Sequence, residues 1–116
     1  MKRLYSLNLH TFFAIALTTL SLSVHAETLD VDAAKAFAKQ NNCFKCHGTN
    51  KDKDGPAFAK IAAKFKDDPK AEEKILQHLI SGVNVKFPDG HEEAHMILKS
   101  DDSKEINNLA AWILSF

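Results

Sequence analysis

The chain has few cysteines, no excess of charge of either sign, and no segment that alternates between apolar and polar residues. Its only two cysteines lie three residues apart, so none remains for the second ligand pair that a zinc site normally needs. Fifteen basic and fifteen acidic residues balance, which argues against a protein that binds nucleic acid through a basic face. The missing two-residue alternation and the absence of repeats favour an all-α fold.

Both cysteines belong to one five-residue motif, Cys43-Phe44-Lys45-Cys46-His47. The spacing Cys-x-x-Cys-His is typical of a c-type haem attachment site. Two thiols on one turn of chain can add across the two vinyl groups of a porphyrin, and the histidine that follows can take the proximal position on iron. The motif therefore predicts one haem c per chain, held covalently through Cys43 and Cys46, with His47 as an iron ligand.

A redox-active cysteine pair of the thioredoxin type is the main alternative for this motif. Such a pair follows a strand in a βαβ unit. The flanking segments, 30–42 and 48–66, carry helix or loop patterns and no run of β-branched residues. Haem attachment is therefore the preferred interpretation.

Residues 1–26 have the pattern of a secretory signal peptide. Lys2 and Arg3 form a charged start, an apolar segment runs from residue 11 to residue 24, and small residues at Val24 and Ala26 allow cleavage after Ala26. A retained membrane anchor is disfavoured, because this segment is shorter than the roughly twenty residues that span a bilayer. We predict removal of the leader and no stable membrane insertion afterwards.

Cleavage would leave a single domain over residues 27–116 with a formal net charge of −2, because the leader contains two basic residues and no acidic one. An export signal agrees with the haem motif, since bacteria attach haem c outside the cytoplasmic membrane. The predicted location is the periplasm. A domain this small has a meagre core, and a covalently held haem would give its helices an apolar body to pack around.

Helical spacing of apolar residues predicts four helices in the mature chain. They lie at about 32–41, from 55–56 onward, at 68–82, and from 102 to the end. Asp68 and Asp102 are the expected N-caps of the last two, with Glu105 completing a capping box, and Gly82 is an expected C-cap. Residues 83–100 form one long loop with a Pro-Asp-Gly turn signal, and so long a loop in a small domain is usually functional.

The mature chain resembles a short bacterial class I cytochrome c. The resemblance covers its whole length: an N-terminal helix, the haem motif, a Gly-Pro-Ala segment, two central helices, a methionine loop and a C-terminal helix. The segments that carry it are Gly55-Pro56-Ala57-Phe58, Ile61-Ala62-Ala63-Lys64-Phe65 and Leu109-Ala110-Ala111-Trp112-Ile113-Leu114-Ser115. It implies about four helices packed around one covalently attached haem.

The resemblance also implies two further site residues. In the family a proline carbonyl accepts a hydrogen bond from the proximal histidine, which assigns Pro56 to His47. A methionine about twenty residues before the end is the second iron ligand, which assigns Met96. The methionine loop departs from the family, because Met96 does not lie between prolines. His91 and His95 of the same loop therefore stay open as alternative ligands.

These assignments predict a periplasmic carrier of single electrons on a His/Met-ligated haem, not an enzyme. Its partners would be a donor reductase and an acceptor oxidase or reductase. A haem-based ligand-binding or sensor protein with a weak or exchangeable sixth ligand is the alternative. A domain that works only within a larger redox complex also stays open. Lysines near the haem segments could form a positive rim for an acidic partner; they are Lys45, Lys51, Lys53, Lys64, Lys66 and Lys99.

Overall fold

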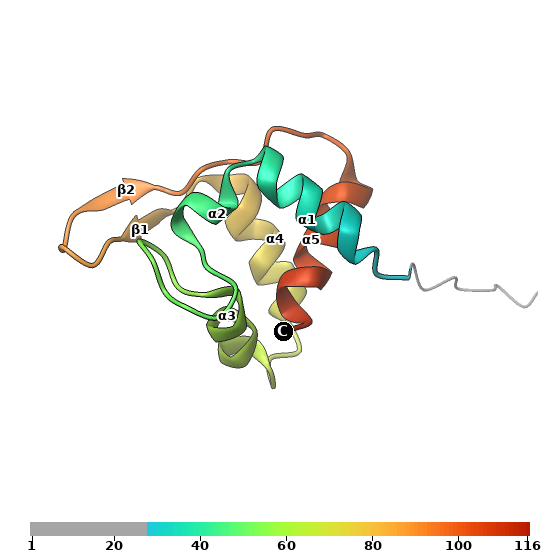
Figure 1. Cartoon of the computed structure of the whole chain (residues 1–116), viewed down its shortest axis with the longest axis horizontal. Helices are drawn as coiled ribbons and strands as arrows, with labels where there is room; N and C mark the ends of the chain where they lie inside the picture. Colours follow the sequence, from blue (N-terminus) through green and yellow to red (C-terminus); the bar gives the residue numbers. More distant parts are fainter. Residues whose placement is uncertain (1–27) are drawn as a thin grey trace, which may run out of the picture.

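The computed structural model describes residues 28–116. The predicted signal peptide and its cleavage after Ala26 lie outside these residues. Five helices and two short strands follow one another in the described part of the chain (Figure 1). In order they are α1 (Val31–Gln40), α2 (Cys43–Cys46), α3 (Phe58–Phe65), α4 (Ala71–Ser81), β1 (Asn84–Lys86), β2 (Glu92–Ala94) and α5 (Ser103–Leu114).

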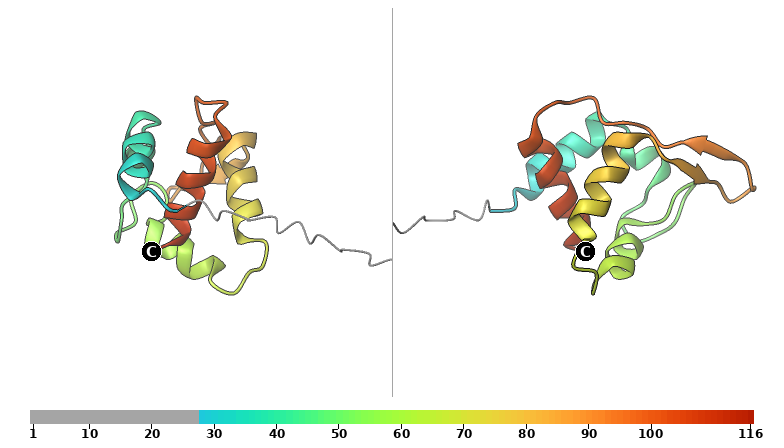
Figure 2. Two further views of the ribbon diagram at one scale, coloured as in Figure 1. Left: turned by 90° about the vertical axis from the view of Figure 1, so that its right-hand side faces the viewer. Right: turned by 180° about the vertical axis from the view of Figure 1, so that it is seen from behind.

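The last helix, α5, is the centre of the packing. It packs against α1, α3 and α4, and the left view of Figure 2 shows it between α1 and α4. Its apolar stripe meets α1 in the deepest part of the core, because Leu109 and Ala110 of α5, like Ala34 and Ala38 of α1, have no exposed surface. The core that forms around this stripe consists of Ala34, Phe37, Ala38, Phe58, Ile75, Leu79, Leu98, Leu109, Ala110, Trp112 and Ile113.

The start of α1 is tied to α5 by side chains from both. The Asp30 carboxylate accepts a hydrogen bond from the Ala33 amide at 2.9 Å and so caps α1. The Asp30 amide donates to Asn108 Oδ1 at 2.9 Å, and Asn108 Nδ2 donates back to the Asp30 carbonyl at 2.7 Å. This reciprocal pair holds the beginning of the domain against its last helix.

The four predicted helices are confirmed, but two of them begin later than expected. Asp68 does not cap α4 directly: its carboxylate accepts from the Lys70 amide at 2.9 Å, which closes a turn before the helix begins at Ala71. Pro56 likewise precedes α3, which begins at Phe58. The fifth helix is the single turn α2, which the haem motif itself forms.

The caps of α4 and α5 follow the sequence pattern with one difference. Gly82 ends α4 in the left-handed conformation, with φ of 62°. Asp102 caps α5 by accepting from the Lys104 amide at 2.8 Å. Glu105 does not reach back to the Asp102 amide; Ser100 lies between them, donating its hydroxyl proton to Glu105 Oε2 and accepting from the Asp102 amide.

The expected loop over residues 83–100 contains a β-hairpin that the sequence did not reveal. Strands β1 and β2 pair antiparallel, with Asn84 opposite Ala94 and Lys86 opposite Glu92. The Gly90 amide donates to the Phe87 carbonyl at 3.0 Å, and Gly90 takes φ of 95°, so the Pro-Asp-Gly signal does form a turn. The hairpin projects from the helical body (Figure 1). Three-residue strands are too short to show a two-residue alternation.

Candidate functional site

The haem motif folds into a single helical turn that presents both thiols on one side. Asn42 adopts a left-handed conformation, with φ of 58°, and so starts α2 directly after α1. Cys43 and Cys46 are three residues apart in this turn, which places their side chains on one helix face. Both are free, partly buried thiols, and burial raises the pKa of Cys43.

His47 follows this turn and is held by the segment before α3. Its Nδ1 lies 2.7 Å from the Pro56 carbonyl oxygen, which can only accept, so Nδ1 carries the proton and Nε2 keeps its lone pair. The ring stacks on Phe58, with centroids 5.4 Å apart. A Cβ at Gly55 would come within 2.7 Å of His47 Cε1, so only glycine allows this close approach. The contact that the family resemblance implied for Pro56 is therefore present.

A cavity of about 790 Å³ opens beside the motif. Its size falls within the range of about 300–1,000 Å³ typical of cofactor and small-molecule sites. Cys43, Cys46, His47, Pro56 and Met96 all line it. Its apolar walls come from α3, α4, α5 and the methionine loop, and include Phe58, Ile61, Phe65, Ile75, Leu79, Leu98 and Ile113.

Hydrogen bonds hold the segment around Met96 against α4, the residues that follow α4, and the end of α1. The His95 amide donates to the Val83 carbonyl at 2.8 Å, and the Leu98 amide donates to the Leu79 carbonyl at 3.1 Å. The Lys99 amide donates to Oδ1 of the buried Asn41 at 2.8 Å. These bonds place Met96 at the cavity, where half of its surface stays exposed.

Three imidazoles stand close together at this cavity. The His95 ring centroid lies 6.0 Å from that of His47 and 4.4 Å from that of His78. His95 Nδ1 donates to the Met96 carbonyl at 2.9 Å, which leaves Nε2 without a proton. Burial lowers the pKa of both His78 and His95, which favours their neutral forms.

His78 was not among the predicted site residues, but the structure brings it to the site. It is partly buried and lines the cavity from α4. Its spacing was the available signal, because His78 shares one helix face with the apolar residues Ile75 and Leu79.

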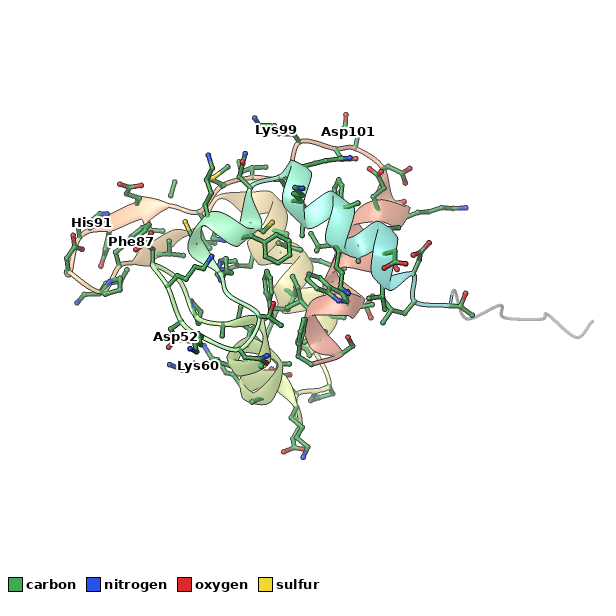
Figure 3. The ribbon with its side chains drawn as sticks, in the orientation of Figure 1. Asp52, Lys60, Phe87, His91, Lys99 and Asp101 are labelled. Carbon is green, nitrogen blue, oxygen red and sulfur yellow. The ribbon has the colours of Figure 1, made fainter. Side chains whose placement is uncertain are left out.

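His91 does not line the cavity; it lies at the hairpin turn between β1 and β2 (Figure 3). Its Nδ1 pairs with Asp89, its Nε2 lies 3.3 Å from Glu93, and its ring stacks on Phe87 at 4.3 Å. These contacts use both ring nitrogens at the hairpin turn. Of the two alternative loop ligands, the structure brings only His95 to the cavity.

We expect His91 to titrate above the ordinary histidine value, because the Asp89 carboxylate accepts a hydrogen bond from its ring and raises its pKa. A pKa raised by folding stabilises the hairpin below the unfolded value, and this contribution is lost as pH rises through the folded value. Ring-proton chemical shifts followed by NMR measure the titration. Asp89→Asn should lower the pKa, whereas Glu92→Gln on β2 should not; an unchanged pKa in Asp89→Asn would contradict the assignment.

A family model described as Cytochrome c matches residues 31–116. The chain belongs to the cytochrome c family. The crystal structure of the Class 1 cytochrome MtoD from Sideroxydans lithotrophicus ES-1 is 51% identical, covers 76% of this chain and 97% of its own, and superposes with a TM-score of 0.74. No curated protein sequence matched.

More distant cytochrome structures agree in fold. Cytochrome c552 of Nitrosomonas europaea is 28% identical, covers 74% of this chain and 98% of its own, and has a TM-score of 0.54. A mutant of that cytochrome gives the same identity and coverage with a TM-score of 0.57. The all-α class I cytochrome c fold is confirmed, with five helices and a small two-stranded sheet where about four helices were predicted.

The residues of this cytochrome c fit a covalently attached haem. Two free thiols and an imidazole with an available Nε2 lie at one mainly apolar cavity, and these are the groups that a haem c attachment site uses; the thioether of Met96 lines the same cavity. The fit rests on chemistry and position together, because the motif alone says nothing of the cavity.

Proposed function

We propose that this cytochrome c carries single electrons on a haem bound through Cys43 and Cys46, with His47 and Met96 as the two axial ligands. Membership of the family implies haem-based electron transfer. The observation that carries the finer proposal is the meeting of these four side chains at one cavity. When bound there, haem supplies a one-electron iron couple whose potential depends on the axial ligands.

Each residue of the site has a definite task in this proposal. Cys43 and Cys46 provide the covalent attachment, and the Pro56 carbonyl keeps His47 in the tautomer whose Nε2 can bind a metal. Phe58 fixes the plane of the His47 ring by stacking on it. The apolar residues of α3 and α4 keep water away from the ligands, which limits the reorganisation that accompanies a change of charge.

We also propose that residues 27–116 act as the mature domain in the periplasm after residues 1–26 are removed. None of the helices found between residues 28 and 116 has the length and apolar character to cross a membrane. Members of the cytochrome c family are typically electron carriers rather than enzymes, and we assign this chain to the carriers. Its partners would be redox proteins that deliver and accept electrons.

A redox titration of the purified holoprotein tests the proposed function. We expect a reversible one-electron transition, and a reduced protein that does not bind carbon monoxide because both axial positions are filled by the chain. Potentiometry followed by visible absorption measures the first property, and addition of the gas measures the second. Rapid carbon monoxide binding by the untreated protein would favour a ligand-binding or sensor function instead.

The position of His95 is the specific observation that favours this second candidate function. A partly buried imidazole with an available Nε2, 6.0 Å from the His47 ring, can compete with a methionine that is half exposed. Competition of this kind would make the sixth ligand exchangeable and would open the iron to small molecules. The substitutions described in the Discussion separate the two possibilities.

A further inference from the structure

A second cavity, of about 660 Å³, opens between α1, α2 and the end of α5. Of the haem motif, only Phe44, which lies between the two cysteines, lines this cavity. Its floor is aromatic. Trp112 is almost fully buried, and its ring centroid lies 6.2 Å from that of Phe44 and 5.1 Å from that of Phe116. Phe116 and Val31 keep 41% and 39% of their surface exposed, so the floor continues into exposed apolar surface.

The rim of this cavity is positive. Lys35 and Lys39 lie four residues apart on one face of α1, and both line the cavity. Lys53 does not line the cavity, although its ammonium group donates to the Phe44 carbonyl at 2.6 Å. No acidic side chain belongs to the lining between residues 28 and 116. We call this site the lysine groove.

The β1–β2 hairpin is the acidic counterpart on the same molecule. Asp89, Glu92 and Glu93 are exposed on it, and its basic residues are Lys86 and His91, of which His91 pairs with Asp89 and Glu93. A Cβ at Gly90 would meet nothing within 4 Å, so the turn is clear of its surroundings. The hydrogen bonds from His91 lower the pKa of Asp89 and keep it ionised. We call residues 86–93 the acidic hairpin.

We propose that the lysine groove of one molecule receives the acidic hairpin of a second copy of this chain. The two surfaces are complementary in charge: one is an acidic hairpin with an exposed Pro88 at its turn, and the other is an apolar hollow with a lysine rim. Attraction between the two rims would orient the molecules, and burial of Phe116 and Val31 would add an apolar contribution.

The hairpin cannot reach the groove of its own chain. It projects from one side of the helical body, whereas most of α1 lies toward the opposite side, as Figures 1 and 2 both show. The contact therefore joins different surfaces of the two molecules, so it leaves a free groove and a free hairpin at the ends of each pair. Such a head-to-tail contact adds further copies as the protein concentration rises.

Charge also argues against the leader as the occupant. Residues 1–26 contain Lys2 and Arg3 and no acidic residue. Basic residues against the lysine rim would repel it. The acidic hairpin of another molecule has the opposite charge and suits the groove better.

Sedimentation equilibrium of the mature holoprotein tests the proposal. A hairpin turn in a groove buries less surface than a stable protein interface, so we expect association only at high micromolar to millimolar concentration. The average mass should rise with concentration at low salt, and this rise should disappear at high salt because the charges are exposed and screened. A monomer at all concentrations and at low salt would overturn the proposal.

A charge-exchange experiment identifies the two surfaces. The groove variant carries Lys35→Glu with Lys39→Glu, and the hairpin variant carries Asp89→Lys with Glu92→Lys. Each should lower the association constant at least about tenfold, because like charges now face each other. Mixing the two variants should restore association, since every reversed groove then meets a reversed hairpin. Restoration also shows that both variants are folded.

The matched control is Lys66→Glu with Lys70→Glu, on the exposed turn between α3 and α4, which changes the net charge as the groove variant does. It should lower association much less than the groove variant. Equal loss in the control, or association in the groove variant at the level of the unmodified protein, would refute the groove as the contact.

Discussion

Replacing either cysteine by alanine should cost this cytochrome most of its stable holoprotein. Cys43 and Cys46 are the only thiols in the chain, so each substitution removes one of two attachment points with no substitute available. The small core would pack around the attached haem, so a chain that fails to hold it loses much of its apolar packing. We expect the yield of holoprotein in Cys43→Ala and Cys46→Ala to fall by about tenfold or more, and further in the double variant.

Acid–acetone extraction and mass spectrometry measure this effect. In the unmodified protein, haem should stay with the polypeptide, and the mass should correspond to residues 27–116 plus one haem. Lys45→Ala is the matched control, because Lys45 is exposed in the same helical turn and should leave attachment unchanged. Free porphyrin in the extract of the unmodified protein, together with two thiols open to alkylation, would contradict covalent attachment.

Replacing Met96 by alanine should have the second largest effect. Loss of the thioether removes the soft ligand that favours ferrous iron, so the reduction potential should fall by on the order of 100 mV, within the range of about 0.8 V that axial ligands span. The weak far-red absorption band of methionine-ligated ferric haem should disappear. Cyanide and carbon monoxide should then bind readily, because one axial position has become open.

Substitutions at neighbouring residues provide the comparison. Ile97→Ala removes a similarly exposed apolar side chain next to Met96 and should keep both the band and the potential. His91→Ala should do the same, since His91 lies at the hairpin turn. His95→Ala decides between the two candidate ligands at the cavity: a silent Met96→Ala with a strongly altered His95→Ala would identify a bis-histidine cytochrome.

Much of the fold could be predicted from the sequence, because apolar spacing and cap residues within each helix indicate where the helices lie. The apolar stripe from Ile106 to Leu114, the glycine at position 82 and the aspartate at position 102 each mark α5 or α4 through short-range physical chemistry. The exact starts of α3 and α4 escaped prediction, since Pro56 and Asp68 fit either a first helical turn or the turn that precedes it. The hairpin escaped because six strand residues carry no periodic signal.

The residues of the candidate site also fall into two groups: those that the sequence predicts and those that only the fold brings to the motif. The spacing of Cys43, Cys46 and His47 predicts the cofactor by covalent chemistry alone, and it needs no knowledge of the rest of the chain. Tertiary structure decides which distant residues join the motif: the Pro56 carbonyl at His47, Met96 and His95 at the cavity, and His78 beside them. It also separates His91 from the cavity, although His91 lies only four residues before His95 along the chain.

The family, the helical class and the attachment motif can be predicted from the sequence, because they depend on residue type and on spacing within a few turns. The approach of the methionine loop to the motif, and the positions of the acidic hairpin and the lysine groove, follow from the fold. The physical reason is that these features depend on long-range bonds, such as those from Leu98 to Leu79 and from Lys99 to Asn41. Bonds between segments far apart in the chain leave no periodic pattern in the sequence.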